Sequence, residues 1–204
     1  MPLTVLYSDS DAIVVDKPVG IATIPERDRA APNVRHQLEA ERGERLFVVH
    51  RLDKPVSGVL IFARHAHAHR HLNQQFAERH ARKTYVALVG GHVEPASGRI
   101  DAPLRAYGSG RMGVDARRGK ACRTRYEVVA QGDAHTRLLL FPETGRRHQL
   151  RVHCYHIGHP ILGDLRYGDA TAQAAYPRLF LHAHQLTVVL PSGKQPTLTS
   201  PMPF

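Results

Sequence analysis

The sequence predicts a single α+β domain over residues 1–204, with a mainly antiparallel mixed β-sheet and flanking helices. Short apolar runs bounded by Gly, Pro, Asp or Ser recur along the chain, and such runs are typical of strands. A few segments instead place apolar residues at helical spacing. A chain of 204 residues is long enough for one sizeable core, whereas two full domains would be crowded.

The chain is expected to begin with a strand pair at residues 3–7 and 12–16, joined by a polar turn. Lys17-Pro18-Val19-Gly20 should end the second strand, because its proline has no N–H and its glycine permits a sharp bend. Residues 21–32 are expected to form a loop.

A short helix is expected next. Asn33 can accept a hydrogen bond from the first turn, and Gly43 suits the left-handed conformation that closes a helix. Val34 and Leu38 lie one turn apart and would form the buried face.

The stretch His50–Gly58 lies between two apolar runs, at residues 46–49 and 59–62. This pattern predicts a turn held between two core strands, which would hold Asp53 more rigidly than a surface loop. Basic side chains flank the aspartate at His50, Arg51 and Lys54. For an isolated aspartate, a salt-bridged turn would be the simpler interpretation.

Residues 65–80 have a helical pattern, with Leu72 and Phe76 on one face. Histidines alternate at the start of this segment, at positions 65, 67, 69 and 71. Only His67 and His71 could share a metal ion on one helix face, and no zinc-binding motif accompanies them. We therefore expect solvated histidines and no metal site.

Residues 83–89 are predicted to form a strand with Tyr85, Ala87 and Val89 on one face. The segment Arg105–Arg125 that follows is Gly-rich and carries seven basic residues against one acid, Asp115. Its glycines favour a flexible arm or a long hairpin. Either a solvated charged loop or an arm that wraps a polyanion would fit this composition.

Residues 125–129 and 137–141 are predicted to pair as strands. A helix is expected to start at Thr144-Gly145, and its arginines and histidines near the N-terminus suit an anion. Closing strands are expected at residues 179–181 and 186–190, followed by a turn and a short last strand.

The charge balance points to a polyanionic partner. Lys and Arg number 28 against 18 Asp and Glu, which gives a formal charge of +10 and a pI near 10.1. Nucleic acid fits this excess best, because no basic amphipathic helix suits a membrane surface and no apolar run is long enough to span one. Two separate cysteines and no secretion signal predict a cytoplasmic location.

Four ordered motifs resemble the RluA family of pseudouridine synthases, in its short type without an N-terminal S4 RNA-binding domain. Asp16 and Val56 stand where the family usually has Asn and Thr. The resemblance extends from about residue 3 to the C-terminus. The motifs are Lys17-Pro18-Val19-Gly20, His50-Arg51-Leu52-Asp53 with Ser57-Gly58, Lys83-Thr84-Tyr85, and Thr144–His153 continued by Gly158–Asp164.

The resemblance implies a pseudouridine synthase fold with a central active-site cleft and Asp53 on its floor. It also implies isomerisation of specific uridines in a stem-loop of ribosomal RNA, tRNA or both, without cofactor or metal. Nothing in the sequence demands more than a monomer. An idle RNA-binding or ribosome-assembly module on the same fold is the alternative. A metal-dependent hydrolase would need ligand clusters that the sequence lacks.

The resemblance also assigns roles to residues. Asp53 would be the catalytic carboxylate, Arg151 would pair with it, and Tyr85 would stack on the flipped uracil. The remaining side chains would bind the substrate: Arg51 in the vacated place of the base, Leu150 at the wall of the base site, and His50, Lys120, Arg146 and Arg147 elsewhere on the RNA.

Overall fold

The computed structural model describes residues 2–26, 28, 30–108 and 110–204. Arg27 and Arg29 of the predicted loop, and Ser109 of the predicted arm, lie outside the described residues. The chain forms two compact units. The first contains Met1–Lys83 and His182–Pro203, and the second contains Thr84–Leu181 with Phe204.

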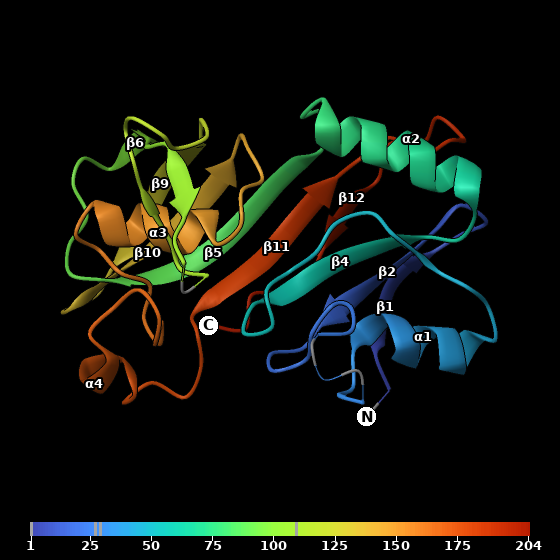
Figure 1. Cartoon of the computed structure of the whole chain (residues 1–204), viewed down its shortest axis with the longest axis horizontal. Helices are drawn as coiled ribbons and strands as arrows, with labels where there is room; N and C mark the ends of the chain where they lie inside the picture. Colours follow the sequence, from blue (N-terminus) through green and yellow to red (C-terminus); the bar gives the residue numbers. More distant parts are fainter. Residues whose placement is uncertain (1, 27, 29, 109) are drawn as a thin grey trace. The chain divides into compact units, whose positions relative to one another are not determined.

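The sheet of the first unit has the strand order β1-β2-β4-β11, with β3 added to β4 and β12 added to β11 (Figure 1). Its pairs are antiparallel except for β4 and β11, which are parallel. The strands are β1 (Thr4–Ser8), β2 (Ala12–Lys17), β3 (Phe47–Val48), β4 (Ser57–Ala63), β11 (Leu181–Thr187) and β12 (Thr197–Thr199). The predicted first strand pair, the strands around Asp53 and the short last strand are therefore confirmed.

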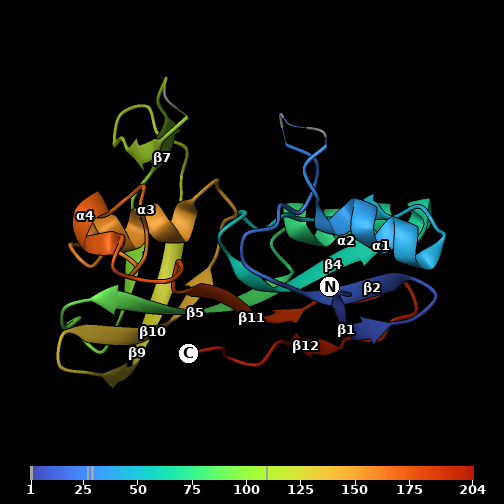
Figure 2. The same cartoon turned by 90° about the horizontal axis from the view of Figure 1, so that it is seen from below.

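The predicted capped helix is α1 (Val34–Arg42). The Asn33 side chain accepts a hydrogen bond from the His36 N–H at 3.0 Å, and Gly43 is left-handed at φ 66°. Val34 and Leu38 are its buried residues, as expected. Figure 2 shows α1 and α2 (Ala66–Ala77) on the same face of this sheet.

The core of the first unit lies between α2 and the sheet. Ala68 and Leu72 of α2 pack with apolar side chains of β2, β4 and β11. Leu72 is fully buried, and its burial agrees with the helical pattern read from the sequence. Burying such a side chain typically contributes about 1.5–3 kcal/mol, so this layer stabilises one face of β4.

The expectation of solvated histidines was wrong for His69 and His71, which are half-buried, whereas His65 and His67 are exposed as expected. The His65 Nδ1 accepts a hydrogen bond from the Ala68 N–H at 3.2 Å and so caps the helix. His69 and His71 each place Nε2 3.0 Å from a backbone carbonyl oxygen. An imidazole can cover apolar surface and still bond with its polar tip, which composition alone does not reveal. Within the described residues, no three His, Cys, Asp or Glu side chains form a candidate metal-binding group.

The second unit has an antiparallel sheet in the order β5-β10-β9-β6 and a separate hairpin of β7 and β8. Its strands are β5 (Arg82–Gly90), β6 (Ser97–Asp101), β7 (Leu104–Ala106), β8 (Met112–Val114), β9 (Arg123–Gln131) and β10 (His135–Pro142). Its helices are α3 (Gln149–His156) and the short α4 (Ala170–Gln173). The strands predicted at 83–89, 125–129 and 137–141 are confirmed within longer elements.

The basic segment Arg105–Arg125, predicted as a flexible arm or a long hairpin, begins with a hairpin, but a short one. β7 and β8 form the hairpin, and the chain enters β9 at Arg123. Asp115 organises the next turn, because its carboxylate accepts the Arg117 and Arg118 N–H groups at 3.0 and 2.8 Å. These hydrogen bonds hold the pKa of Asp115 below its usual value.

The helix predicted to start at Thr144-Gly145 starts later, at Gln149. His148 has φ 52°, a left-handed conformation that a helix cannot continue through. The Gln149 side-chain oxygen accepts the Arg146 N–H at 3.0 Å and the Thr144 hydroxyl at 2.8 Å. A loop held by side-chain hydrogen bonds therefore takes the place of the first turn of the predicted helix.

The two closing strands predicted at 179–181 and 186–190 were also wrong, because the single strand β11 connects them. The polar residues that separate the two apolar runs are bonded inside the fold. His182 Nδ1 lies 2.8 Å from the Ser57 hydroxyl, and His184 Nδ1 lies 2.8 Å from the Ser200 carbonyl oxygen. Local composition could not reveal these partners.

The α+β class and the mainly antiparallel mixed sheet are confirmed by these strand pairs. The single catalytic domain over residues 1–204 and the cleft with Asp53 on its floor stay predictions. None of the described helices is both long and apolar enough to cross a membrane.

Candidate active site

Asp53 lies in the turn between β3 and β4 of the first unit. The Asp53 carbonyl oxygen accepts the Val56 N–H at 2.9 Å, which closes the turn. Asp53 is half-buried, Leu52 before it is buried, and Arg51 is exposed. Buried Leu52 anchors the turn in the fold, while the Arg51 side chain faces solvent.

Two buried polar side chains hold this turn from the N-terminal segment. The Thr23 hydroxyl donates to the Leu52 carbonyl oxygen at 2.9 Å and accepts the Leu52 N–H at 3.1 Å. Lys17 is fully buried, and its Nζ donates to the carbonyl oxygens of Pro18, Ile21 and Lys54 at 2.8, 2.8 and 3.2 Å. The ammonium therefore joins the Lys-Pro turn to the chain just after Asp53.

Ser57 and Gly58 lie where β4 meets β11, in register with His182 and Ala183. The buried Ser57 hydroxyl bonds to the His182 ring. Gly58 has φ 112°, and a Cβ there would lie 2.2 Å from the Ala183 carbonyl oxygen. Only glycine fits so close to a neighbouring backbone.

His50 supports the turn as a neutral ring. Burial, and then the positive charge of Lys83, lower the pKa of His50 to about 3. Its Nε2 accepts the Ile61 N–H at 3.2 Å, and its ring stacks on Phe76 with centroids 4.9 Å apart. Burial also lowers the pKa of Lys83 itself. The contacts of His50 tie the turn to β4 and α2.

In the second unit, Tyr85 lies near the start of β5, opposite Leu140 of β10. Tyr85 is half-buried, whereas Val86, Ala87, Leu88 and Val89 after it are buried. Leu150 is buried in the first turn of α3. Both side chains thus lie where an element of the second unit begins.

Arg151 is buried in α3 and forms a two-pronged ion pair with Asp164. Its Nε and one Nη each lie 2.7 Å from a carboxylate oxygen, and the Asp164 side chain has no exposed surface. Asp164 Oδ1 also accepts the N–H groups of Arg166 and Tyr167 at 3.0 and 3.2 Å. Such a paired, fully hydrogen-bonded charge fixes the direction of the guanidinium.

Tyr167 extends this network. Its hydroxyl accepts the Met112 N–H at 3.0 Å and lies 2.6 Å from His148 Nδ1. The Arg151 guanidinium lies over its ring at 5.1 Å, and burial raises the pKa of the phenol. Tyr167 therefore connects β8, the left-handed residue before α3, and Arg151.

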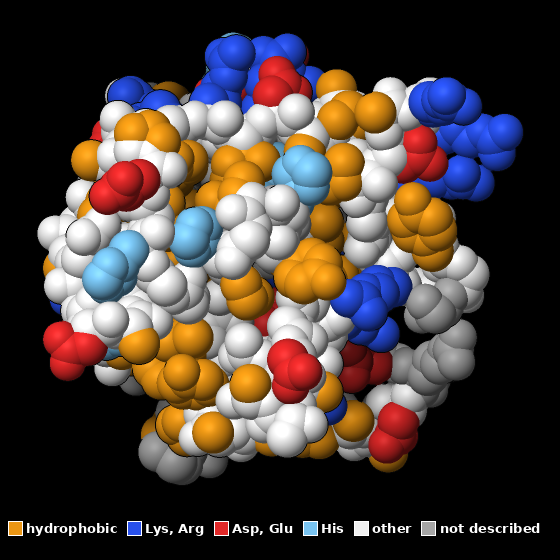
Figure 3. Space-filling model, turned by 90° about the vertical axis from the view of Figure 1, so that its left-hand side faces the viewer, with side chains coloured by type: hydrophobic (Ala, Val, Ile, Leu, Met, Phe, Trp, Pro, Cys, Tyr) orange, Lys and Arg blue, Asp and Glu red, His pale blue; other side chains and the backbone are white. Residues whose placement is uncertain are grey.

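Lys120, Arg146 and Arg147, which were predicted to bind the RNA, are all exposed in the second unit. Arg147 approaches the hairpin, because a Cβ built on Gly110 would lie 3.6 Å from its guanidinium. Figure 3 shows Lys and Arg side chains grouped at the margins of that view, with hydrophobic and His side chains between them.

Within each unit, the structure brings several predicted residues together. His50, Arg51 and Asp53 share one turn of the first unit, and Leu150 and Arg151 share one turn of α3. Sequence reasoning gave no role to Thr23, Asp164 or Tyr167. Their partners are distant in sequence or local only in the folded loop, although Asp164 lies inside a matched motif.

Comparison with known proteins agrees with these motifs. A family model described as RNA pseudouridylate synthase matches residues 11–156. The dual-specificity RNA pseudouridine synthase RluA of Escherichia coli O6:H1 is 43% identical over 209 residues, covering 99% of this chain and 94% of that protein. RluA of Haemophilus influenzae is 36% identical over 206 residues, with the same two shares.

Solved structures give the same result. Human RNA pseudouridylate synthase domain containing 1 superposes with a TM-score of 0.86 at 30% identity, covering 100% of this chain and 84% of the other. Human RNA pseudouridylate synthase domain containing 4 gives 0.80 at 26% identity, covering 98% and 88%. The chain therefore belongs to the RNA pseudouridylate synthase family and is an isomerase that acts on RNA.

Proposed function

We propose that this enzyme converts specific uridines of ribosomal RNA, tRNA or both into pseudouridine, with Asp53 as the catalytic carboxylate. The RluA relatives are named dual-specificity enzymes, which supports more than one RNA class for this chain. We propose a cytoplasmic location, because Cys122 and Cys154 are free and buried as in a reducing compartment. The proposed enzyme acts as a monomer.

The reaction moves the attachment of the base without adding or removing atoms. The N1–C1′ bond of the uridine breaks, the uracil turns, and a C5–C1′ bond forms. C5 loses its proton and N1 gains one. Asp53 either attacks the sugar or the base, or removes a sugar proton, and an ionised carboxylate suits each route.

The anchoring of the Asp53 turn is the observation that supports this proposal most. Lys17 and Thr23 bond to the backbone on either side of Asp53, and Ser57 is bonded to His182. A catalytic group held by buried polar contacts keeps its geometry better than one on an ordinary surface turn.

Arg151 and Tyr85 are proposed to assist Asp53. The ion pair with Asp164 fixes the direction of the Arg151 guanidinium, which suits a side chain that orients a catalytic carboxylate. Tyr85 would stack on the flipped uracil, an interaction typically worth about 1–3 kcal/mol. Its half-buried position at the start of β5 leaves part of the side chain accessible. Leu150 would add an apolar wall.

The target base must leave its stack, which costs a few kcal/mol and least in a loop. Arg51 would take the vacated place, and its exposure supports this role. Lys120, Arg146 and Arg147 would hold phosphates and set the register of the stem-loop. For His50, the buried contacts support a positioning role for the turn.

Pseudouridine mapping tests this proposal. Total RNA is mapped from cells that carry the wild type, Asp53→Ala, or no copy of the protein. We expect the same few sites to disappear with Asp53→Ala and with the deletion, because neither can carry out the reaction. Purified wild-type protein should restore these sites on the unmodified RNA.

Asp53→Asn and Glu44→Gln serve as matched variants for the purified assay. Asn keeps the shape of Asp53 but cannot act as a carboxylate, so it should reduce turnover by about 10²–10⁴-fold. Glu44→Gln removes a carboxylate that pairs with Arg64 in the same unit and should keep activity. Normal sites in cells with Asp53→Ala would disprove the assignment of Asp53.

A further inference from the structure

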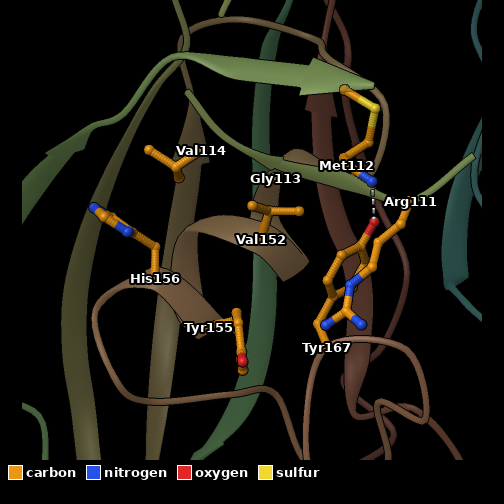
Figure 4. A pocket seen from close by; sticks show the side chains of 8 residues that line it. All are labelled: Arg111, Met112, Gly113, Val114, Val152, Tyr155, His156 and Tyr167. Carbon is orange, nitrogen blue, oxygen red and sulfur yellow. Dashed lines mark hydrogen bonds between the residues drawn. The ribbon is translucent and has the colours of Figure 1, made fainter. Parts of the chain in front are cut away.

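A pocket of about 450 Å³ lies inside the second unit, between β8, the C-terminal half of α3 and Tyr167 (Figure 4). Its volume is within the range of small-molecule sites. The lining residues are Arg111, Met112, Gly113, Val114, Val152, Tyr155, His156 and Tyr167. None of the eight residues is acidic.

The pocket has an apolar floor and an accessible aromatic ring. Val152 lies near the middle of the lining residues, with Val114 above it to the left and Tyr155 below it (Figure 4). Residues 149–154 of α3 are buried, but Tyr155 is 48% exposed. A large aromatic surface at the mouth of an apolar hollow suits a flat, unstacked ring.

One side of the pocket is cationic. The Arg111 guanidinium lies 5.3 Å from the centroid of the Tyr167 ring, and His156 lies on the opposite side of the hollow (Figure 4). Asp164, which lies near this region in sequence, is buried and held by Arg151. With Arg111 and no acidic residue among the eight that line the pocket, the lining favours an anionic ligand.

Tyr167 also joins this pocket to the network of Arg151. Arg111 and Arg151 each place a guanidinium over the Tyr167 ring, at 5.3 and 5.1 Å. Val152 follows Arg151 directly, and Tyr155 lies one helical turn beyond it, about 5–6 Å along the axis. A ligand in the pocket would therefore lie close to the arginine proposed to assist catalysis.

We propose that this pocket binds a second nucleotide of the RNA substrate, one that is not the target uridine. Its base would stack on Tyr155 over the two valines, and its phosphate would face Arg111. Sequence-specific RNA recognition commonly uses unstacked loop bases on aromatic side chains, which matches this combination of ring and charge. The inference rests on the proposed function, since it assumes a stem-loop whose loop is opened.

An abasic scan tests this site by affinity. The probe is the stem-loop around the uridine that the wild type modifies, with each other loop nucleotide replaced in turn by an abasic one. Wild type should lose affinity on the order of tenfold at one position, because the stacked base is missing. Tyr155→Ala should bind the intact probe as weakly as wild type binds that abasic probe. An abasic nucleotide at the same position should not weaken the binding of Tyr155→Ala any further.

Two control variants test whether the effect is specific to the aromatic ring of Tyr155. Tyr155→Phe keeps the ring and should retain the wild-type profile. Tyr176→Ala removes another partly exposed tyrosine of the second unit, 39% exposed and outside the pocket, and should also retain it. A probe with 5-iodouridine at the sensitive position should crosslink to the peptide that contains Tyr155, which tests the site without any substitution.

Identical abasic profiles for wild type and Tyr155→Ala, with crosslinks elsewhere, would overturn the proposal. Binding is measured with the Asp53→Asn background as well, so the outcome does not depend on turnover. An active Asp53→Asn variant would refute the catalytic assignment and leave the pocket result valid. If Asp53→Asn is inactive but Tyr155→Ala gives the same abasic profile as wild type, the catalytic assignment stands and the pocket proposal fails.

Discussion

Individual polar residues in the first unit hold the Asp53 turn from inside. Lys17 and Thr23 bond to its backbone, and neutral His50 accepts a backbone N–H of β4. A buried polar group that loses its partner typically costs about 1–3 kcal/mol, so each contact strongly restricts the conformation of the turn. Each of these three residues lies within the resemblance to the family, but its partners became known only from the fold.

The low pKa of His50 predicts a pH-dependent stability. The folded-state pKa of about 3 lies below the usual value of 6.5, so the unfolded chain binds this proton first as the pH falls. His50 therefore gives its full contribution above pH 6.5 and loses it progressively between pH 6.5 and 3. Between pH 6 and 4, this loss should be about 1 kcal/mol per pH unit.

Urea unfolding of wild type and His50→Gln over this pH range measures the effect. Gln keeps a hydrogen-bond acceptor but has no proton to gain, so the variant should lose less stability per pH unit. The other titrating groups act equally in both proteins and cancel in the comparison. Parallel curves for the two proteins would show that His50 does not remain neutral in the fold.

At the scale of elements, the parallel contact of β4 with β11 depends on Gly58. Its φ of 112° is a backbone conformation that other residues rarely adopt. In addition, a Cβ at this position would lie 2.2 Å from the Ala183 carbonyl oxygen, so there is no room for a side chain. Ser57 beside it bonds to His182 in the same register. The position of the Asp53 turn therefore follows from the fit between two strands.

Gly58→Ala should lower the free energy of unfolding by at least about 3 kcal/mol, because the methyl group would force the strands apart. Gly193→Ala is the matched control, since Gly193 has φ 80° but nothing within 4 Å of an added Cβ. It should cost only about 1–2 kcal/mol, the typical penalty for a left-handed residue. Equal losses in chemical denaturation would mean that β4 and β11 do not approach so closely.

The sequence predicted those elements whose signals are local. Asn33 and Gly43 delimit α1 because the caps are made by the residues themselves. It missed the true start of α3, where His148 is left-handed, and it divided β11 at His182 and His184, whose partners are Ser57 and the Ser200 carbonyl oxygen. Contacts between residues so distant in sequence leave no periodic pattern.

Across the whole molecule, the charge of +10 should govern RNA binding. Removing one side chain that binds a phosphate should lower the slope of log K against log salt by about 0.7 for single-stranded RNA. Arg146→Ala with Arg147→Ala should therefore lower the slope by about 1.4, twice that value. The affinity should fall similarly for matched and mismatched sequences, because phosphate contacts carry no base information.

A double variant with the same change in net charge separates local contacts from general attraction. Arg42→Ala with Arg70→Ala removes two arginines of the first unit instead. It should leave the slope near the wild-type value in a salt titration of RNA affinity. If both double variants lowered the slope equally, Arg146 and Arg147 would contribute only through net charge.

The candidate site could be predicted from sequence only in part. Asp53, Tyr85 and Arg151 lie in motifs that can be matched residue by residue, so their proposed roles came from the resemblance. The ion pair of Arg151 with Asp164 and the hydrogen bonds of Tyr167 depend on how the chain after α3 folds back. Neither spacing nor composition reveals that arrangement.

The order of synthesis adds a consequence of the pairing between β4 and β11. A ribosome delivers residues 57–63 well before residues 182–187, with Thr84–Leu181 of the second unit in between. Until then, the edge of β4 that β11 will cover lacks that partner, and Ser57 lacks His182. A nascent chain can therefore form the β4–β11 part of the support of Asp53 only near the end of translation, and products of early termination should lack the bond between Ser57 and His182.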